Sequence, residues 1–290
     1  MEYNGILNVY KTQNISSNHV VISIKKILNI KKVGHTGTLD PLACGVLPIC
    51  IGNATKVSEY LLSNDKTYSV GVKFGILTDT YDLEGTVLEE DENFKADPSK
   101  VLEVLESFVC EYDQIPPKYS ALKINGNRAY DLARKGVDFQ LESRKVKIYS
   151  ITDIKINENT CFFTVKCSKG TYIRSLCYDI GKKLGTYGTM IFLERVSSGF
   201  FSKDTSVNFD DLNEETIKNN IISVDEVIPI PKLKIDEPEI LRLLLNGVVV
   251  RNPKYVNKIT QGVYFLYDHN KLKGICKRES DYLKLIKFLN

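Results

Sequence analysis

One loop constrains this chain more than any other segment. The stretch VGHTGTLDPLACGVLPICIGNATK, residues 33–56, places four glycines and two prolines around a single carboxylate, Asp40. Glycine permits backbone angles that are closed to other residues, while Pro41 and Pro48 fix their own φ and keep the residue before each out of the helical region. An isolated Asp-Pro pair is usually only a turn. Here the surrounding residues instead predict a rigid, irregular loop that presents Asp40.

Length and composition predict a globular protein of two domains. The chain has 290 residues, and a single domain commonly has about 100–200. Hydrophobic residues make up 43% and charged residues 26%, and no apolar run approaches the roughly 20 residues that cross a membrane. The N-terminus, MEYNGILNVYKTQ, has the pattern of neither a signal peptide nor a transit peptide. We therefore expect a cytoplasmic protein that makes no membrane contact.

The cysteines indicate neither a disulfide framework nor a zinc site. Seven cysteines, an odd number, are spread along the chain without one C-x-x-C pair, and only three histidines accompany them. This usage is typical of small buried side chains in a reducing compartment. The glycine-rich loop also fits neither G-x-G-x-x-G nor G-x-x-x-x-G-K-[ST], the common phosphate-cradling motifs.

Hydrophobic periodicity predicts an α+β core. Apolar residues at helical spacing indicate several helices, with Ser17 as a plausible N-cap, and the alternation in KTYSVGVKF indicates a strand with one buried face. Strands and helices are interspersed without a βαβ rhythm, so we expect a mixed, largely antiparallel central sheet flanked by helices and loops. The expected helices are residues 17–28, 54–62, 97–109, 128–135 and 171–184; the expected strands are residues 66–74 and two within 144–168.

The last 60 residues predict a separate basic module. Three prolines between residues 224 and 238 mark a boundary, which gives domains 1–230 and 231–290. A short helix, PEILRLLLNG, and the strand candidates VVVR, GVYFLYD, LKGICKR and YLKLIKF indicate a small β-barrel. Residues 231–290 contain 12 Lys/Arg against 6 Asp/Glu, a net of +6, so the other 230 residues total −3. This asymmetry favours a contact with phosphates.

The loop around Asp40 also resembles a known catalytic motif. Its arrangement G-H-T-G-x-L-D-P-x-A-x-G-V-L-P is similar to that of the TruB family of tRNA pseudouridine synthases, in which the aspartate is essential. Three other segments resemble the family: KTY followed by FGILTDTYDLEG, CSKGTYIRSL, and QIPPKYSALKINGNRAYDLARKG. The resemblance spans most of residues 5–200 and implies the pseudouridine synthase fold. More loosely, residues 231–290 resemble the PUA-type RNA-binding domain.

By this resemblance, three residues are expected to carry the chemistry. Asp40 is the catalytic carboxylate. Arg174 matches the arginine of the family's Y-x-R motif, and an arginine beside a carboxylate orients it and favours its charged form. Tyr68 matches the active-site tyrosine, so we expect it to stack on the uracil and to be a candidate base.

Three more residues are expected to bind the substrate. Tyr172, two residues before Arg174, is expected to line the same pocket. His35 is placed to occupy the space that a flipped base leaves or to hold neighbouring nucleotides. Lys56 closes the family motif and is expected to contact phosphate or Asp40. The QIPPKYSALKING segment is expected to be structural and RNA-facing.

The implied reaction moves the glycosidic bond of uridine from N1 to C5. No atoms are gained or lost, so the resemblance implies neither a cofactor nor a metal. The carboxylate either attacks carbon covalently or removes a sugar proton to give a glycal, and the sequence leaves both routes open. The uridine is stacked in its tRNA loop, so it must first be flipped out at a cost of about a few kcal/mol.

The chain departs from the family in two places. The family's N-terminal K-P-x-G-x-T-S segment reads KTQNISS here, from Lys11 to Ser17, without its proline and glycine. We therefore expect this support of the catalytic loop to be less rigid. Cys44 stands where the family commonly has threonine, so one hydrogen bond is expected to be weaker.

The preferred function is a stand-alone tRNA pseudouridine synthase that acts on the T-loop uridine, tRNA position 55. Its expected partner is the tRNA T-stem-loop, with neither a guide RNA nor an obligate protein partner. One alternative is an RNA-binding or tRNA-folding protein whose catalysis is incidental or lost. Another is a guide-RNA-dependent relative.

Overall fold

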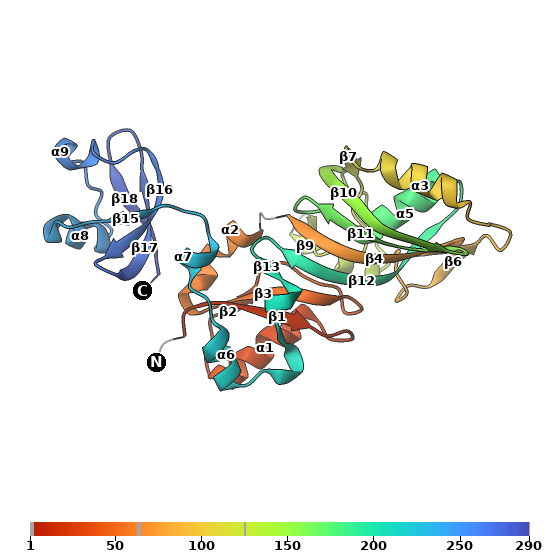
Figure 1. Cartoon of the computed structure of the whole chain (residues 1–290), viewed down its shortest axis with the longest axis horizontal. Coiled ribbons are helices and arrows are strands. Elements are labelled where there is room, and N and C mark those ends of the chain that lie inside the picture. Colours follow the sequence, from red (N-terminus) through yellow and green to blue (C-terminus); the bar gives the residue numbers. More distant parts are fainter. Residues whose placement is uncertain (1–2, 63–64, 125, 290) are drawn as a thin grey trace.

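The main body of the protein is one large mixed sheet. The computed structural model describes residues 3–62, 65–124 and 126–289, and Figure 1 shows this sheet on the right and a smaller sheet on the left. Neighbouring strands of the large sheet run antiparallel except for the pairs β1–β14 and β3–β12. Its order is β14(Val207–Asn208), β1(Gly5–Lys11), β3(Cys44–Ile51), β12(Gly188–Ser198), β4(Lys66–Phe74), β11(Thr160–Cys167), β10(Arg144–Asn157) and β7(Glu111–Gln114), with β2(Val33–His35) on β3 and β13(Phe201–Ser202) on β12. The predicted α+β class and largely antiparallel sheet are confirmed.

The alternation of KTYSVGVKF sets one face of the sheet. In β4, Tyr68, Val70, Val72 and Phe74 are all buried, as expected for every second residue of a strand. Helices α3(Pro98–Ser107) and α5(Ile173–Lys183) contribute buried residues to the same core cluster. Tyr68 therefore points into the layer that contains α5.

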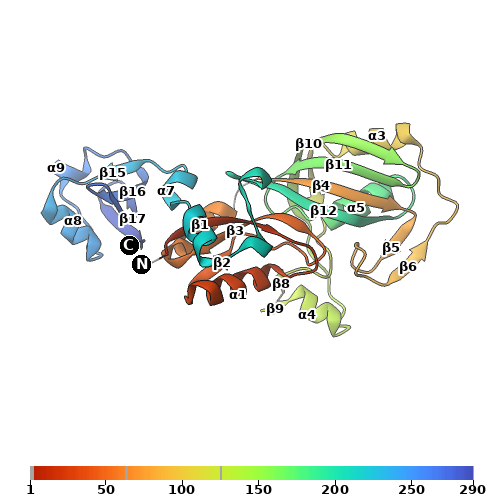
Figure 2. The same cartoon turned by 60° about the horizontal axis from the view of Figure 1, so that its bottom comes forward.

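The first helix begins one residue earlier than its expected cap. Helix α1(Ser17–Leu28) is capped by Ser16, whose side chain accepts from the His19 amide. The prediction of Ser17 as N-cap is therefore wrong. Because Ser16 caps the helix, the Ser17 hydroxyl can bond the Asp40 loop instead, where it contacts both backbone groups of Leu39. Figure 2 shows α1 lying along β1 and β2.

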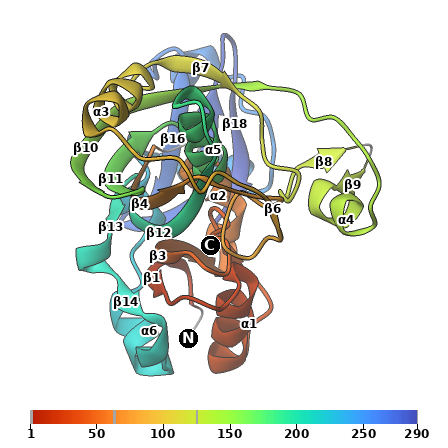
Figure 3. The ribbon, with the colours of Figure 1, turned by 90° about the vertical axis from the view of Figure 1, so that its right-hand side faces the viewer.

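Other predicted helices form with small changes. Residues 54–62 are not one helix: η1(Gly52–Val57) is a 3-10 turn that leads into α2(Ser58–Leu62). Helix α4(Ala129–Arg134) and the hairpin of β8(Lys123–Ile124) and β9(Asn127–Arg128) stand away from the sheet (Figure 3). The remaining elements of this body are β5(Ile76–Thr78), β6(Val87–Glu90), η2(Lys203–Thr205), η3(Phe209–Asp211), α6(Glu214–Asn220) and α7(Val224–Val227).

The C-terminal module is a four-stranded sheet with two helices, and the expected barrel closure is not found within its described residues. Its order is β15(Lys232–Lys234), β16(Gly262–Asp268), β17(Lys271–Arg278) and β18(Leu283–Phe288), with α8(Pro238–Leu245) and α9(Pro253–Val256). Three strand candidates are confirmed. The fourth, VVVR, makes only an isolated bridge from Val250 to Leu283. The unpredicted β15 is three residues long between prolines, too short to show a period.

Apolar packing and hydrogen bonds attach this module to the main body. One buried cluster includes Ile6 and Val57 from the body and Phe265 and Ile275 from the module. Asp225 of α7 accepts from Tyr267 and Lys232 of the module. Burial alone would raise the pKa of Asp225, but hydrogen bonds from Ser223, Tyr267 and Lys232 outweigh it and lower that pKa to about 2. The carboxylate is therefore charged at neutral pH and holds the two parts together.

Candidate active site

The carboxylate of Asp40 is paired with the guanidinium of Arg174. The Arg174 Nη2 donates to Asp40 Oδ1 at 3.3 Å, and its Nε forms an ion pair with Oδ2 at 3.0 Å, so the guanidinium contacts both carboxylate oxygens. The Asp40 side chain is 34% exposed, whereas that of Arg174 is 7% exposed. The carboxylate is thus oriented from behind and remains open to a ligand in front.

The loop is fixed on both sides of Asp40. On one side, the Ser17 hydroxyl donates to Leu39 O at 2.9 Å and accepts from Leu39 N at 2.8 Å. On the other side, the Pro41 carbonyl accepts from the Asn14 amide at 2.8 Å and from Lys11 Nζ at 3.3 Å. Asp40 therefore sits between two anchored neighbours.

The altered KTQNISS segment still supports this loop. Asn14 takes a left-handed conformation, with φ 66°, at the position where the resembling family has glycine; asparagine tolerates that region better than most residues. The Lys11 ammonium is fully buried and also donates to Thr12 O and Ile15 O. Burial lowers the pKa of Lys11 to about 8. Asn14 thus adopts the backbone conformation that the missing glycine would permit, and the retained Lys11 ties the segment to Pro41.

Arg174 joins three segments that are distant in sequence. Besides Asp40, it donates to Thr80 O at 3.1 Å and Tyr119 O at 2.9 Å, and it pairs with Asp82 at 3.5 Å. Asp82 is almost fully buried and accepts from the Thr80 hydroxyl at 2.6 Å. Asp82 belongs to the FGILTDTYDLEG segment, for which the sequence predicts no chemical role. The structure places it as the second carboxylate on the arginine.

Tyr68 lies on the same side of the sheet as α5. It is 8% exposed and pairs across the sheet with Val165 of β11 and Arg195 of β12. Burial raises the pKa of the Tyr68 hydroxyl; the charge of Arg195 opposes that shift, and the charge of Asp40 adds to it. Asp40 and Tyr68 therefore share one electrostatic environment.

Tyr172 is held at the start of α5 by Gln114, which belongs to the segment predicted to be structural and RNA-facing. The Gln114 amide accepts from Tyr172 N at 2.8 Å and donates to Tyr172 O at 3.1 Å. The Arg144 guanidinium lies over the Tyr172 ring, 4.5 Å from its centre. Gln114 opens the QIPPKYSALKING segment, of which Asn125 lies outside the described residues. This segment thus fixes Tyr172 and, through Tyr119, Arg174.

His35 lies where the Asp40 loop begins, whereas Lys56 lies at the C-terminal module. His35 belongs to β2, and its Nδ1 accepts from the Gly37 amide at 3.4 Å. Burial and the nearby Arg195 lower the pKa of His35, so the ring is neutral at neutral pH. Lys56 instead donates to Phe288 O of the C-terminal module at 2.6 Å. The expected contact between Lys56 and Asp40 is therefore wrong, because η1 carries Lys56 toward that module.

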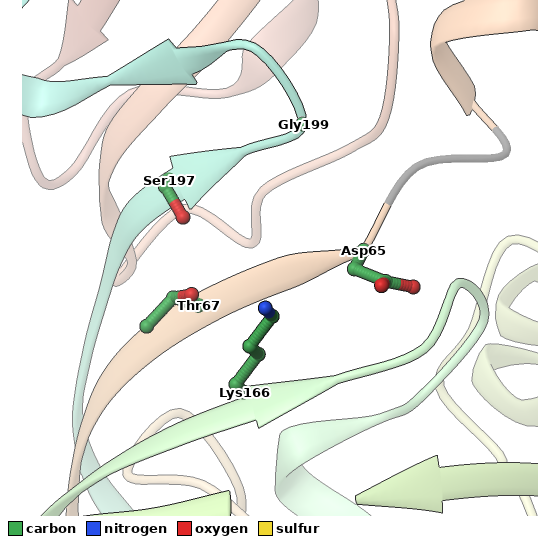
Figure 4. Close-up of a pocket in the computed structure, with 5 residues that line it drawn as sticks. All are labelled: Asp65, Thr67, Lys166, Ser197 and Gly199. Atoms are coloured by element: carbon green, nitrogen blue, oxygen red, sulfur yellow. The ribbon is translucent and has the colours of Figure 1, made fainter. Parts of the chain in front are cut away.

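A polar hollow of about 370 Å³ lies on the other face of the sheet. Figure 4 shows its lining residues Asp65, Thr67, Lys166, Ser197 and Gly199. Thr67 precedes Tyr68 in β4, so their side chains point to opposite faces. The hollow is therefore separate from the Asp40 site.

Within the described residues, no group of three or more His, Cys, Asp or Glu side chains is arranged to hold a metal ion. The absence of a cofactor stays a prediction. Nor does any helix in the described part of the chain have the length and apolarity needed to cross a membrane.

Comparison with known proteins adds independent findings. The family model "TruB family pseudouridylate synthase (N terminal domain)" matches residues 25–173, and "tRNA pseudouridylate synthase B C-terminal domain" matches residues 174–231. A protein named tRNA pseudouridine synthase B from Clostridium tetani is 48% identical over 288 residues, 99% of each chain. One of the same name from Clostridium acetobutylicum is 45% identical over 98% of this chain and 99% of its own. A chain in a crystal structure of a Cbf5-Nop10-Gar1 complex superposes with a TM-score of 0.71 at 25% identity, covering 99% of this chain and 85% of that one.

Proposed function

The chain belongs to the TruB family of pseudouridine synthases, and we propose that it is a tRNA pseudouridine synthase that isomerises the T-loop uridine, position 55 of tRNA. The observation that carries this proposal is the Asp40 carboxylate, contacted at both oxygens by the buried Arg174 yet still 34% exposed. A carboxylate that is oriented by an arginine on one side and exposed on the other suits attack on a flipped-out uridine.

The residues around Asp40 supply what this isomerisation needs. Asp40 acts on the sugar or the base, by covalent attack or by removal of a sugar proton. Arg174 contacts both carboxylate oxygens and so fixes the orientation of the carboxylate. Tyr68 stacks on the detached uracil, which then rebonds through C5. Its hydroxyl is the candidate base at C5: the oxygen takes the C5 proton while the hydroxyl's own proton passes to water. Tyr172 lines the pocket on the α5 side.

His35 serves recognition rather than charge pairing in this proposal. Because its pKa is lowered, the neutral ring is suited to stacking or to one hydrogen bond with a base. Lys56 has no part in the uridine pocket. Its exposed side chain lies at the junction with the C-terminal module, where it is available to a phosphate of a longer RNA.

The direct test is tritium release from tRNA transcript labelled at uracil C5. The purified chain should release tritium from a transcript with the T-loop uridine and none from a transcript with cytidine there. Release with the chain alone, without guide RNA or added protein, distinguishes it from a guide-dependent relative. Tight binding without release would favour the tRNA-folding alternative, in which catalysis is lost.

The C-terminal module is proposed to bind the acceptor side of the tRNA as a PUA-like domain. Its net charge of +6 and the start of its sheet at Lys232 support a domain of residues 231–290 beside a catalytic domain of residues 1–230. The four-stranded sheet supports a related β architecture. Because residues of the module complete a buried cluster with the main body, removing it would expose apolar surface there. Point substitutions are therefore the better test.

Neutralising the module should weaken tRNA binding and its dependence on salt. Lys254, Lys258 and Lys284 are exposed, and each phosphate contact contributes roughly 1 to the slope of log K against log salt. The triple Lys→Gln variant should flatten that slope by up to about 3, measured by filter binding between low and moderate salt.

The matched control removes three exposed lysines from the main body, Lys95, Lys100 and Lys155. It changes the net charge equally but leaves the module intact. Equal flattening by both variants would show only a general effect of charge and would exclude the module as a specific RNA contact.

A further inference from the structure

Arg195 of β12 is buried directly beneath the catalytic loop. Only 2% of it is exposed. Its Nε donates to Val46 O at 2.6 Å, and its Nη2 donates to Gly37 O at 3.1 Å. Gly37 and Val46 lie on either side of Asp40 in the sequence. One side chain therefore holds the start and the end of the loop that presents the carboxylate.

The backbone of Arg195 fits the same loop. Residues Arg195 and Gly45 are parallel neighbours in the sheet. Gly45 has φ +108°, and a Cβ added there would lie 2.3 Å from Arg195 O. Glycine is required at this approach because any side chain would push the two strands apart. The loop is thus seated on Arg195 by main chain and side chain together.

On its other side, Arg195 is the cross-strand neighbour of Tyr68 in β4. A guanidinium has only donors, so a hydrogen bond between the two groups uses the Tyr68 oxygen as acceptor and turns the hydroxyl hydrogen elsewhere. The charge of Arg195 also counters the effect of burial on the pKa of Tyr68. Arg195 therefore influences both the direction and the acidity of that hydroxyl.

The charge of Arg195 is not explained by packing. Within the described residues, no carboxylate forms an ion pair with it; the carboxylates near the site pair with Arg174. The titratable groups that sense its field include the buried Lys11 and Lys66 and the ring of His35, whose pKa values it lowers. Burying an unpaired cation among these groups costs stability that an apolar side chain would not. We therefore explain the charge of Arg195 by the groups that it contacts.

We propose that Arg195 is a positioning residue of the reaction: its buried guanidinium holds the Asp40 loop and the Tyr68 hydroxyl in a fixed relation across the uridine pocket. This inference rests on the proposed function. In this proposal Arg195 positions both Asp40 and Tyr68, whereas Arg174 positions Asp40 alone.

The test compares Arg195→Lys with Arg278→Lys. Arg278 is also a buried strand arginine, 6% exposed, whose Nε donates to a carbonyl, Val256 O, at 2.8 Å, but it lies in the C-terminal sheet. All donors of a lysine lie on one nitrogen, which cannot take the separate positions from which Nε and Nη2 of Arg195 reach Val46 O and Gly37 O. Arg195→Lys should lower the single-turnover rate of tritium release about 10²-fold with tRNA Kd within about threefold of wild type. Arg278→Lys should leave the rate within about threefold.

A double-mutant cycle with Tyr68→Phe separates positioning from simple loss of stability. If Arg195 acts partly through Tyr68, the double variant should lose less than the product of the two single losses. Thermal unfolding confirms that each variant is folded at the assay temperature, and Arg195→Gln, which keeps one amide donor group, takes the place of the lysine variant if that one is unfolded.

The outcomes are distinguishable. An inactive wild-type chain would overturn the proposed function itself. An active wild type with equal rate losses in the Arg195 and Arg278 variants, or with fully multiplicative losses in the cycle, would overturn only the role of Arg195.

Discussion

Replacing Asp40 with asparagine should abolish isomerisation while tRNA binding persists. Asparagine has nearly the same shape, and its oxygen can still accept from Arg174, so the loop should remain in place. It is neither a nucleophile nor a base at neutral pH, and the loss of such a group typically costs about 10²–10⁴-fold in rate. Asp40 is the only carboxylate of its loop. We therefore expect the rate of tritium release to fall by at least the upper end of that range.

The control for this variant is Asp65→Asn. Asp65 lines the hollow on the opposite face of the sheet, so the same chemical change there should leave the rate within about twofold of wild type. Kd for the transcript, measured by filter binding, should stay within a few-fold for both variants. An Asp40→Asn protein that keeps more than a tenth of the wild-type rate would demote Asp40 to a residue that only shapes the turn.

The sequence could predict the part of the site that its motifs contain. Glycines and prolines mark the Asp40 loop in the sequence. Arg174 lies in a predicted helix that follows a strand and a turn, and its predicted pairing with Asp40 is confirmed. Alternation in β4 also set the face of Tyr68. These predictions succeed because local periodicity and backbone restriction act over a few neighbouring residues.

The missed residues depend on contacts between distant strands. Arg195 stands in no quoted motif, and its role appears only when β12 is placed between β3 and β4. The Gln114 side chain bonds the backbone of Tyr172, 58 residues away, and the Tyr119 carbonyl accepts from the side chain of Arg174, 55 residues away. The one available signal was an arginine in the strand-like segment MIFLERV, since a charge is rarely buried without a role.

Lys56 shows the opposite error. Lys56 closes a catalytic motif and was expected to contact phosphate or Asp40. The strand β3, 8 residues long, lies between Asp40 and Lys56, and a strand rises about 3.3 Å per residue, so Lys56 is far from the carboxylate. Its side chain then reaches the last strand of the C-terminal sheet. A motif gives proximity in sequence, but an extended strand within it separates its ends in space.

Arg174→Lys should be the second most damaging substitution, because every donor group of Arg174 is in use. Its Nε serves Asp40, its Nη2 serves Asp40 and Tyr119 O, and its Nη1 serves Thr80 O and Asp82. An ammonium has three donors at one point and cannot reach all of these acceptors. We expect the single-turnover rate of tritium release to fall by at least about 10²-fold through misorientation of Asp40.

The same substitution should also lower stability, since Asp82 is only 3% exposed and would lose much of its counter-charge; breaking a buried pair costs about 3–5 kcal/mol, of which a lysine would recover a part. Arg251→Lys is the matched control, because Arg251 pairs with Asp281 where both side chains are about 60% exposed and such pairs contribute about 0–1 kcal/mol. Urea unfolding measures the stability of both variants. If Arg174→Lys were as active and as stable as Arg251→Lys, Arg174 would be only one of several cations near Asp40, and the orientation of the carboxylate would have to come from its loop alone.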